Sequence, residues 1–435
     1  MERLSSKDSA TVTVIGGGAN GLFTALDLAL RGVKVILVER GDIGSGTSGK
    51  FHGLLHSGAR YAVTDPGSAK ECAEENEVIS RIAPHVVRDT GGLFLGITEE
   101  EVEFSERFLK SLDSLGIKHR VMDRGELQKA EPHANPSTRI AVWVPDKVIH
   151  GYDLLASVAF TASLSGATIL TQAEVVEIRR GSELKVKILD RLTGETHVVE
   201  SQIVVNASGP WSFKVTELAG IGEVPVLPTA GIMVVFDRRL NNMVLNRLRP
   251  PSDGDILVPY GENSILGTTA TVVDDPDNFS IADEEVNLLL REGVKLVPGL
   301  AQAKVSRVYA SVRPLIANAD SGRQASRDYL ILEHEEVPGL ISVIGGKFTT
   351  ARLLGEKVGD LVASKLGVKE RSRTRDIRLS GPLDLDPSWV SPDMREMVSK
   401  VLARRGSLDE ERYITSLYVV LSTIAGRRRW SSGAI

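Results

Sequence analysis

The chain has 435 residues, of which 42% are hydrophobic and 25% are charged, with a formal net charge of −5 and one cysteine. This length exceeds what one hydrophobic core usually supports, so two or more lobes are expected. The mild acidity gives no support to a nucleic-acid partner. The lone Cys72 excludes an internal disulfide framework and a cysteine-ligated iron–sulfur cluster within this chain.

The N-terminal residues 1–10 are polar and lack the basic and then apolar pattern of a secretion signal, which predicts a cytoplasmic protein. No segment reaches the roughly 18 uncharged apolar residues of a membrane-spanning helix. Any membrane contact is therefore expected to be peripheral, on the cytoplasmic face.

A predicted strand, residues 11–15, runs into glycines at positions 16, 18 and 21, and a helix-favouring segment, 22–30, follows them. This Gly-x-Gly-x-x-Gly pattern between a strand and a helix predicts a dinucleotide site. Gly16 permits the tight turn, Gly18 lets a pyrophosphate approach the backbone, and Gly21 lets the helix pack closely on the sheet. The N–H groups at the helix start would then face the phosphates.

The second predicted strand, residues 33–39, ends at Glu39, at the spacing of a carboxylate that binds the adenosine ribose. The pattern alone does not separate FAD from NAD. A glycine turn in an ordinary βαβ unit is the structural alternative.

Residues 42–61 form a loop rich in glycine, serine and other polar groups, which is expected either on the surface or around a ligand. The hydrophobic pattern then predicts further elements in chain order. These are an exposed amphipathic helix at 67–82, helices at 99–115 and about 152–165, a hairpin around 192–195, and a strand from 203 that ends in a turn of small residues.

From 225 to about 312 the pattern changes to short strands with glycine and proline turns and one helix near 283–296, which predicts a second lobe built on an antiparallel sheet. A buried-type strand, 340–344, then leads into Gly345-Gly346 and a helix that ends near Leu366. The positive end of that helix would suit the electron-rich edge of a reduced flavin.

Several collinear motifs resemble the FAD-dependent glycerol-3-phosphate dehydrogenases, over roughly the first 370 residues. The closest likeness is to the large flavoprotein subunit of the anaerobic bacterial enzyme. The matching stretches are 16–61, which includes His52 to Asp65, and then 203–211, Asp253 to Pro259, 311–315 and 345–352.

The resemblance implies an α/β fold in which a Rossmann-like FAD-binding domain carries an inserted antiparallel-sheet substrate domain, as in glycine oxidase and D-amino acid oxidase. The implied boundaries are 1–90, 145–220 and 325–370 for the discontinuous FAD-binding domain, 91–144 and 221–324 for the substrate or cap domain, and 371–435 for a helical C-terminal region.

The activity that the resemblance implies is oxidation of sn-glycerol 3-phosphate to dihydroxyacetone phosphate. A hydride would leave C2 for N5 of a non-covalent FAD, and the electrons would pass to quinone directly or through a partner subunit. The resembling subunit continues into a cysteine-rich domain, whereas this chain carries only Cys72.

Planar guanidinium groups suit a phosphate monoester, which carries close to two negative charges. The resemblance places Arg60, Tyr61, Arg313, Arg327 and Lys347 at the substrate, with Arg313 and Arg327 as the phosphate holders. The catalytic candidates are Arg313, Lys347 and His56, and the general base is not assigned. For His56, as for His52, a hydrogen bond inside a buried loop is the alternative explanation.

The resemblance also implies the residues that hold FAD, and no metal site is assigned. Gly16, Gly18, Asn20, Gly21, Glu39 and Arg40 would contact the adenosine and pyrophosphate; Thr47, Ser48, Leu54, Leu55 and His56 the pyrophosphate and flavin; Val175 the adenine, through its backbone; Ala207 and Gly209 the ribityl chain; and Gly346, Lys347, Phe348 and Thr349 would close the site. Leu54, Leu55 and Val175 could instead be core residues. Ala230 departs from the family, in which a lysine or a nearby histidine occupies this region, so substrate contacts from this strand are in doubt.

Near the C-terminus, a short apolar run, 416–425, precedes Arg427 to Trp430. This segment is expected either to dock a partner subunit or an anionic membrane surface, or to be a terminal helix with a solvated basic end. Two other functions stay open: an FAD-dependent oxidase or dehydrogenase of another small 2-hydroxy or 2-amino acid, and a non-catalytic flavin-containing subunit.

Overall fold

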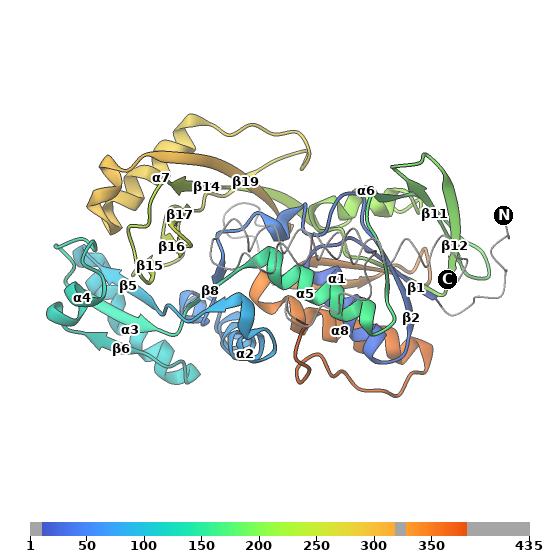
Figure 1. Ribbon diagram of the computed structural model, residues 1–435, viewed down its shortest axis with the longest axis horizontal. Helices are drawn as coiled ribbons and strands as arrows, with labels where there is room; N and C mark the ends of the chain where they lie inside the picture. The colour runs from blue at the N-terminus through green and yellow to red at the C-terminus, as the bar shows by residue number, and fades with distance from the viewer. Residues whose placement is uncertain (1–10, 318–327, 381–435) are drawn as a thin grey trace, which may run out of the picture. The chain divides into compact units, whose positions relative to one another are not determined.

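The computed structural model describes residues 11–317 and 328–380 (Figure 1). The chain divides into two compact units, residues 1–49, 151–227 and 314–435 in the first and 50–150 and 228–313 in the second. The sequence-based boundaries differ mainly at 50–90, which here belong to the second unit. Assigning FAD to one domain and substrate to the other stays a prediction. Arg327, the 416–430 segment and the tail beyond residue 380 lie outside the described residues.

The first unit is built on a six-stranded sheet in which the strands β1, β2, β9, β13 and β21 run parallel. An antiparallel strand, β20, forms one edge. In sheet order the strands are β20 (Tyr329–Glu333), β21 (Leu340–Gly345), β13 (Ile203–Asn206), β1 (Thr11–Ile15), β2 (Lys34–Val38) and β9 (Thr168–Leu170). Because the strands are parallel, their carboxyl ends lie at one edge of the sheet, where ligands bind in folds of this kind.

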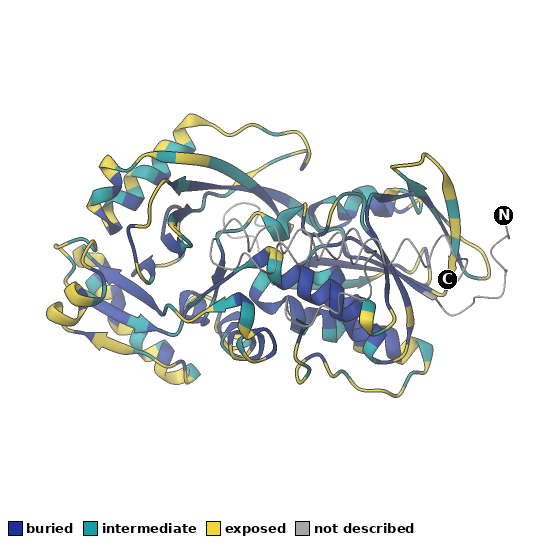
Figure 2. Ribbon diagram, viewed as in Figure 1, coloured by how far each residue is buried: buried dark blue, intermediate teal, exposed yellow. Residues whose placement is uncertain are grey.

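Three helices, α1 (Ala19–Leu30), α5 (Gly151–Leu164) and α8 (Ala351–Leu366), pack together against this sheet (Figure 1). The helices α1 and α8 approach so closely that a Cβ added at Gly359 would lie 1.9 Å from Asp27 Oδ2. Figure 2 shows α1 and α5 mostly in the colour of buried residues, as expected of apolar helices enclosed by neighbours.

An antiparallel sheet of β10 (Ala173–Arg179), β11 (Leu184–Asp190) and β12 (Thr196–Ser201) also packs on the parallel sheet. Ile15, Ile36 and Val204 of the parallel strands share a hydrophobic core with Val186 and Ile188 of β11. The predicted hairpin around residues 192–195 is confirmed by the β11/β12 pair.

The second unit contains a nine-stranded sheet. In sheet order its strands are β18 (Thr271–Val272), β14 (Val226–Phe236), β17 (Asn263–Gly267), β16 (Ile256–Tyr260), β15 (Val244–Arg247), β5 (Gly92–Gly96), β7 (Ile140–Val144) and β6 (Arg120–Met122), with β19 (Val305–Ile316) beside β14. The pairs β14/β17, β16/β17 and β5/β7 are antiparallel, as predicted, but β5 and β15 pair in parallel. A smaller sheet joins β3 (Leu54–Leu55), β8 (Lys147–Ile149) and β4 (Val87–Arg88).

Helices cover both faces of the nine-stranded sheet. On one face, Leu289 and Leu296 of α7 (Asp283–Leu296) pack among core residues of the central strands. On the other, Phe104 and Phe108 of α3 (Glu99–Leu115) join a core that includes Cys72 of α2 (Pro66–Ile82). The predicted bounds of α3 and α7 are confirmed.

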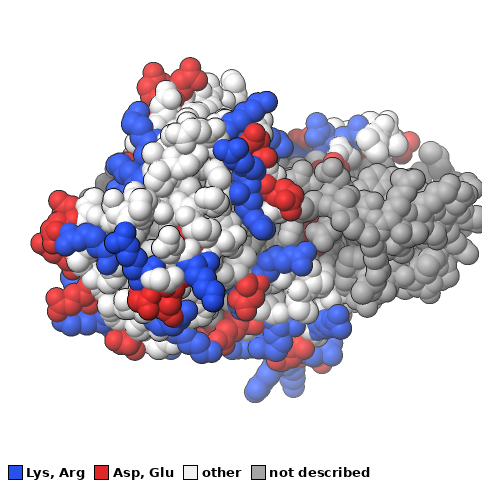
Figure 3. Space-filling view, turned by 60° about the vertical axis from the view of Figure 1, so that its left-hand side comes forward, with Lys and Arg blue, Asp and Glu red and all other residues white. Residues whose placement is uncertain are grey.

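Two further findings concern surfaces. The prediction of an exposed helix at 67–82 is wrong in its exposure, because α2 also buries the polar side chains of Glu75 and Asn76. On the face shown in Figure 3, lysine and arginine side chains lie among aspartate and glutamate side chains instead of forming a field of one sign. Within residues 11–317 and 328–380, no helix is long and apolar enough to cross a membrane.

Glu131, which follows α4 (Arg124–Ala130), is a buried acid with an incomplete set of partners. It is 1% exposed, and its Oε1 accepts hydrogen bonds from the backbone N–H groups of Asn242 and Met243. Its Oε2 has no hydrogen-bond partner among the described residues. Burial raises the pKa of Glu131 to about 7, against the opposing effects of those bonds and of Arg239.

We expect this residue to make stability fall as the pH rises. The folded state holds the proton of Glu131 more tightly than the unfolded chain, so this stability is present below about pH 4.5 and is lost as the pH rises through about 7. Glu131→Gln, which imitates the neutral acid, should match the wild type at pH 5 and exceed its free energy of unfolding by about 1–3 kcal/mol at pH 8. Urea denaturation from pH 5 to 8 measures this. The control is Glu103→Gln at an exposed position of α3, and a Glu131→Gln curve parallel to the wild type would contradict the assignment.

Candidate functional site

Three strand ends of the first unit meet at the carboxyl edge of its parallel sheet. Ala207 N, just after β13, donates to Ile15 O at 2.9 Å, and a Cβ at Gly16 would lie 2.5 Å from Ala207 O. Asn20 Nδ2 donates to Gly345 O at 3.1 Å across 325 positions of the sequence. The structure therefore brings the first glycine turn, the turn after β13 and the second glycine turn together.

The turn before α1 leaves backbone donors at the start of the helix. Gly16 has φ +112°, a backbone conformation that favours glycine. The N-cap residue is Gly18, which has no side chain to cap the helix. Ala19 N donates to Ser48 Oγ at 3.0 Å. A Cβ at Gly21 would lie only 2.0 Å from Gly16 O. The glycine pattern thus permits close helix packing, and the helix start suits a phosphate group.

Glu39, at the end of β2, lies beside this turn. Its Oε2 accepts from Gly17 N and its Oε1 from Gly41 N, both at 2.7 Å. A carboxylate oxygen can accept more than one hydrogen bond, so both oxygens keep capacity for ribose hydroxyls. Arg40 stacks over the ring of Trp211, with Cζ 4.7 Å from the ring centroid. The donor-rich helix start and the neighbouring carboxylate fit the adenosine and pyrophosphate of FAD.

The second glycine turn lies between β21 and α8. Gly345 and Gly346 both have positive φ, at +81° and +86°, and Gly346 N donates to Asp328 O at 3.0 Å. Lys347 N donates to Thr350 Oγ1 at 3.4 Å, just before the start of α8. Thr349 is buried, and the side chain of Lys347 is half-buried.

The side chains of Leu54, Leu55 and Val175 are core residues, at 1%, 0% and 8% exposure. Leu54 packs in a cluster of the second unit that includes Val148, and Val175 packs in the core of the first unit. Any contact with FAD would therefore come from their backbone. Their assignment to the cofactor stays a prediction.

The loop His52 to Tyr61 in the second unit is held by buried polar groups. Ser57 N donates to Asp146 Oδ1 at 2.7 Å, and Asn76 Nδ2 donates to Leu55 O at 3.0 Å. Burial raises the pKa of Asp146, against the opposing effects of Ser57, Arg60 and Asn246. The ring of His56 lies 5.3 Å from that of Tyr61 and 6.3 Å from that of His52, between ring centroids.

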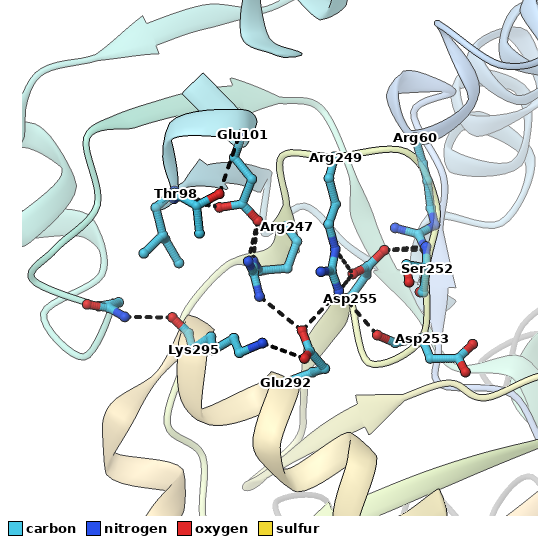
Figure 4. Close-up of polar contacts among 12 residues, drawn as sticks. Arg60, Thr98, Glu101, Arg247, Arg249, Ser252, Asp253, Asp255, Glu292 and Lys295 are labelled. Atoms are coloured by element: carbon cyan, nitrogen blue, oxygen red, sulfur yellow. Dashed lines mark hydrogen bonds and ion pairs between the residues drawn. The ribbon is translucent and has the colours of Figure 1, made fainter. Parts of the chain in front are cut away.

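Arg60 belongs to a short helix, η2 (Ala59–Tyr61), and lies in a network of alternating charges (Figure 4). Its side chain is 6% exposed, and its Nη2 lies 3.2 Å from Oδ2 of the fully buried Asp255. The same nitrogen donates to Ser252 O at 3.3 Å. Its Nε and Nη1 are buried and have no hydrogen-bond partner among the described residues. Such donors are costly to bury unless an acceptor joins them.

Arg313 lies on β19 and donates through Nη2 to Thr269 O. A Cβ at Gly231 of β14 would lie 2.5 Å from this nitrogen, so the neighbouring backbone closely confines the guanidinium. Ala230 of β14 is 6% exposed and pairs with Thr271.

Arg60, Tyr61 and Arg313 belong to the second unit, and Lys347 belongs to the first. Two acids of the second unit escaped the sequence-based prediction: Asp146, which holds the 52–61 loop, and Asp255, which pairs with Arg60. Asp255 lies inside the matched run Asp253 to Pro259, and that is the one signal that could have drawn attention to it.

Comparisons with known proteins support the dinucleotide site that the glycine turns predict. Residues 11–361 match a family model described as FAD dependent oxidoreductase. The chain is 42% identical over 408 residues to one of the subunits of the anaerobic glycerol-3-phosphate dehydrogenase of Escherichia coli K12, covering 92% of this chain and 74% of that protein.

Two solved structures share the fold. Glycine oxidase from Geobacillus kaustophilus has a TM-score of 0.67 and 23% identity, with 86% of this chain and 99% of that chain covered. A glycerol-3-phosphate dehydrogenase from Bacillus halodurans complexed with FAD has a TM-score of 0.68 and 24% identity, covering 98% and 83%. These likenesses confirm the predicted fold class.

Proposed function

This chain belongs to the FAD-dependent oxidoreductases and, within them, to the glycerol-3-phosphate dehydrogenases, and we propose that it oxidises sn-glycerol 3-phosphate to dihydroxyacetone phosphate. Its cofactor is FAD. The observation that carries the choice of substrate is Arg60, a nearly buried arginine whose Nε and Nη1 have no hydrogen-bond partner among the described residues. A phosphate group supplies the acceptors that these donors need.

The first unit supplies groups that suit the cofactor. The start of α1 offers donors to the pyrophosphate, and Glu39 offers acceptors to the adenosine ribose. When bound, FAD would supply a two-electron acceptor for the oxidation at C2 of the substrate. Gly346, Lys347, Phe348 and Thr349 would form the boundary of the site at the start of α8.

Of the groups assigned to the substrate, the second unit supplies Arg60, Tyr61 and Arg313, and the first unit supplies Lys347. Arg60 and Arg313 would bind the phosphate, together with Arg327, and Tyr61 would border them. The substrate must also lose its C2 hydroxyl proton, and His56 and Lys347 are the side chains proposed near this proton. Neither is assigned as the base. We propose that the electrons pass on to a quinone, directly or through a partner polypeptide, at the cytoplasmic face of a membrane.

One experiment tests the reaction. The purified yellow protein is mixed anaerobically with sn-glycerol 3-phosphate, and bleaching of the flavin absorbance is followed. We expect full bleaching, and reoxidation by a quinone analogue. Bleaching by lactate or an amino acid, but not by sn-glycerol 3-phosphate, would support a different small 2-hydroxy or 2-amino acid as substrate. No bleaching by any of them would support a non-catalytic flavin subunit, and rapid reoxidation by oxygen alone would indicate an oxidase.

A further inference from the structure

We propose that Asp255 is a positioning residue for the substrate: it holds Arg60 through Nη2 and leaves Nε and Nη1 of that guanidinium to the substrate's phosphate. This inference rests on the proposed function, because it takes a phosphorylated substrate as the anion. Asp255 lies between β15 and β16 and is 0% exposed. It is separated from Arg60 by 195 positions in the sequence.

The carboxylate of Asp255 divides its two oxygens between two arginines. Oδ2 accepts from Arg60 Nη2 at 3.2 Å and from Ser252 N at 2.5 Å. Oδ1 accepts from Arg249 Nε at 2.8 Å and lies 2.7 Å from Arg249 Nη2. Each oxygen thus has a fixed direction, and Arg60 meets a carboxylate that cannot turn without losing other bonds.

Further charges fix the far side of this carboxylate (Figure 4). Arg249 Nη2 donates to Glu292 Oε2 of α7 at 3.0 Å, and Arg247 Nη1 donates to the same oxygen at 3.1 Å. Arg247 Nε in turn donates to Glu101 Oε1 of α3 at 2.6 Å. Burial alone would raise the pKa of Glu292, but Lys295, Arg249 and Arg247 hold it below its ordinary value.

The network lacks a hydrogen-bond acceptor at one end, beside Arg60. Arg247, Arg249 and Arg60 alternate with Glu101, Glu292 and Asp255, and Lys295 also pairs with Glu292, so cations outnumber carboxylates in this network by one. Within the described residues, the Nε and Nη1 of Arg60 are the only arginine nitrogens that are buried without a hydrogen-bond partner. The position that lacks an acceptor is therefore at Arg60, where the proposed function places the phosphate.

The test compares Asp255→Asn with the wild type by anaerobic flavin reduction at increasing sn-glycerol 3-phosphate. An asparagine can keep its oxygen toward Arg249 only by turning its NH₂ group toward Arg60, so the hold on Nη2 is lost. We expect the substrate concentration for half-maximal reduction rate to rise about ten-fold or more, with the limiting rate changed less than about three-fold. An unchanged concentration would overturn the proposal.

Glu101→Gln is the matched control, because it neutralises an equally buried carboxylate in the network that does not contact Arg60. It should lower the melting temperature while leaving the half-maximal concentration within about two-fold. A double-mutant cycle separates positioning from general destabilisation. In an Arg60→Ala background, Asp255→Asn should raise the half-maximal concentration less than about two-fold. A full ten-fold rise there would contradict the role of Asp255 through Arg60.

If Asp255→Asn does not fold, Arg60→Lys carries the test. A lysine keeps a charge for Asp255 but has a single nitrogen, so the half-maximal concentration should rise about ten-fold or more. Inorganic phosphate gives a readout without turnover: it should raise the melting temperature of the wild type but not of Arg60→Lys. If sn-glycerol 3-phosphate does not bleach the wild type while this phosphate effect holds, the proposed substrate fails and the anion site at Arg60 stands. If phosphate stabilises both proteins equally, the proposal about Arg60 and Asp255 fails.

Discussion

Arg313→Ala should weaken the apparent affinity for sn-glycerol 3-phosphate by roughly 100-fold while FAD stays bound. The guanidinium of Arg313, on β19, lies against Gly231 of β14, where an added Cβ would be 2.5 Å from Nη2, and Nη2 donates to Thr269 O. A charged donor that is already held in place binds phosphate with little loss of conformational freedom. Removing it should cost about 3 kcal/mol of binding free energy, which corresponds to that loss of affinity.

The measurement is the concentration of sn-glycerol 3-phosphate at which the flavin reduction rate reaches half its maximum. The matched control is Arg307→Ala on the same strand, because Arg307 is exposed and stacks on Tyr309. It should change that concentration less than about two-fold. Loss of FAD from Arg313→Ala would show that Arg313 supports the cofactor instead, and unchanged affinity would remove it from the phosphate site.

The first glycine turn could be predicted from the sequence because all its determinants are local. The apolar run of β1, the spacing from Gly16 to Gly21 and the acid at Glu39 lie within a single βαβ unit, and each agrees with the others. The bounds of α3 were predictable for the same reason. Thr98 and Glu101 form a capping box at its start, and Gly116 ends it in the left-handed conformation.

The Arg60 network could not be predicted, because it depends on contacts between distant segments. Arg60 and Asp255 are 195 positions apart, and Arg247 and Glu101 are 146 apart. Most arginine and aspartate side chains are exposed to solvent. Nothing in the spacing of these residues shows that they are buried and paired with one another. The pairing of β15 with β5 and the packing of α3 and α7 on the nine-stranded sheet bring Arg247, Glu101 and Glu292 together, and the 52–61 loop brings Arg60 to Asp255.

Burial was misjudged where polar residues face the core. The many charges of α2 predicted an exposed helix, yet Glu75 and Asn76 are buried, and Asn76 binds the backbone of Leu55. The residue type alone does not show whether a polar side chain is buried or exposed. A polar side chain can be buried where the fold gives it a hydrogen-bond partner. Leu54 and Leu55 are buried in the core, which was the alternative stated for them, and their assignment to FAD stays a prediction.

Gly21→Ala should abolish FAD binding and lower activity by more than about 100-fold. A Cβ at position 21 would lie 2.0 Å from Gly16 O, which is a backbone atom and cannot rotate away as a side chain would. The helix α1 must then shift from β1, and the donors at its start shift with it. Gly17 N, which precedes this helix start, donates to Glu39 Oε2, so a displacement of about 1 Å would also disturb the proposed ribose-binding carboxylate.

The measurement is the ratio of flavin absorbance to protein in the folded peak of a size-exclusion column, so that loss of FAD is distinguished from unfolding. Gly32→Ala is the control at the other end of α1, where the residue also has a positive φ, +77°, but an added Cβ meets nothing within 4 Å. It should lose about 1 kcal/mol of stability and keep its FAD. A yellow Gly21→Ala protein with full activity would mean that α1 can move without releasing the cofactor, and that the pyrophosphate is held mainly by groups outside this turn.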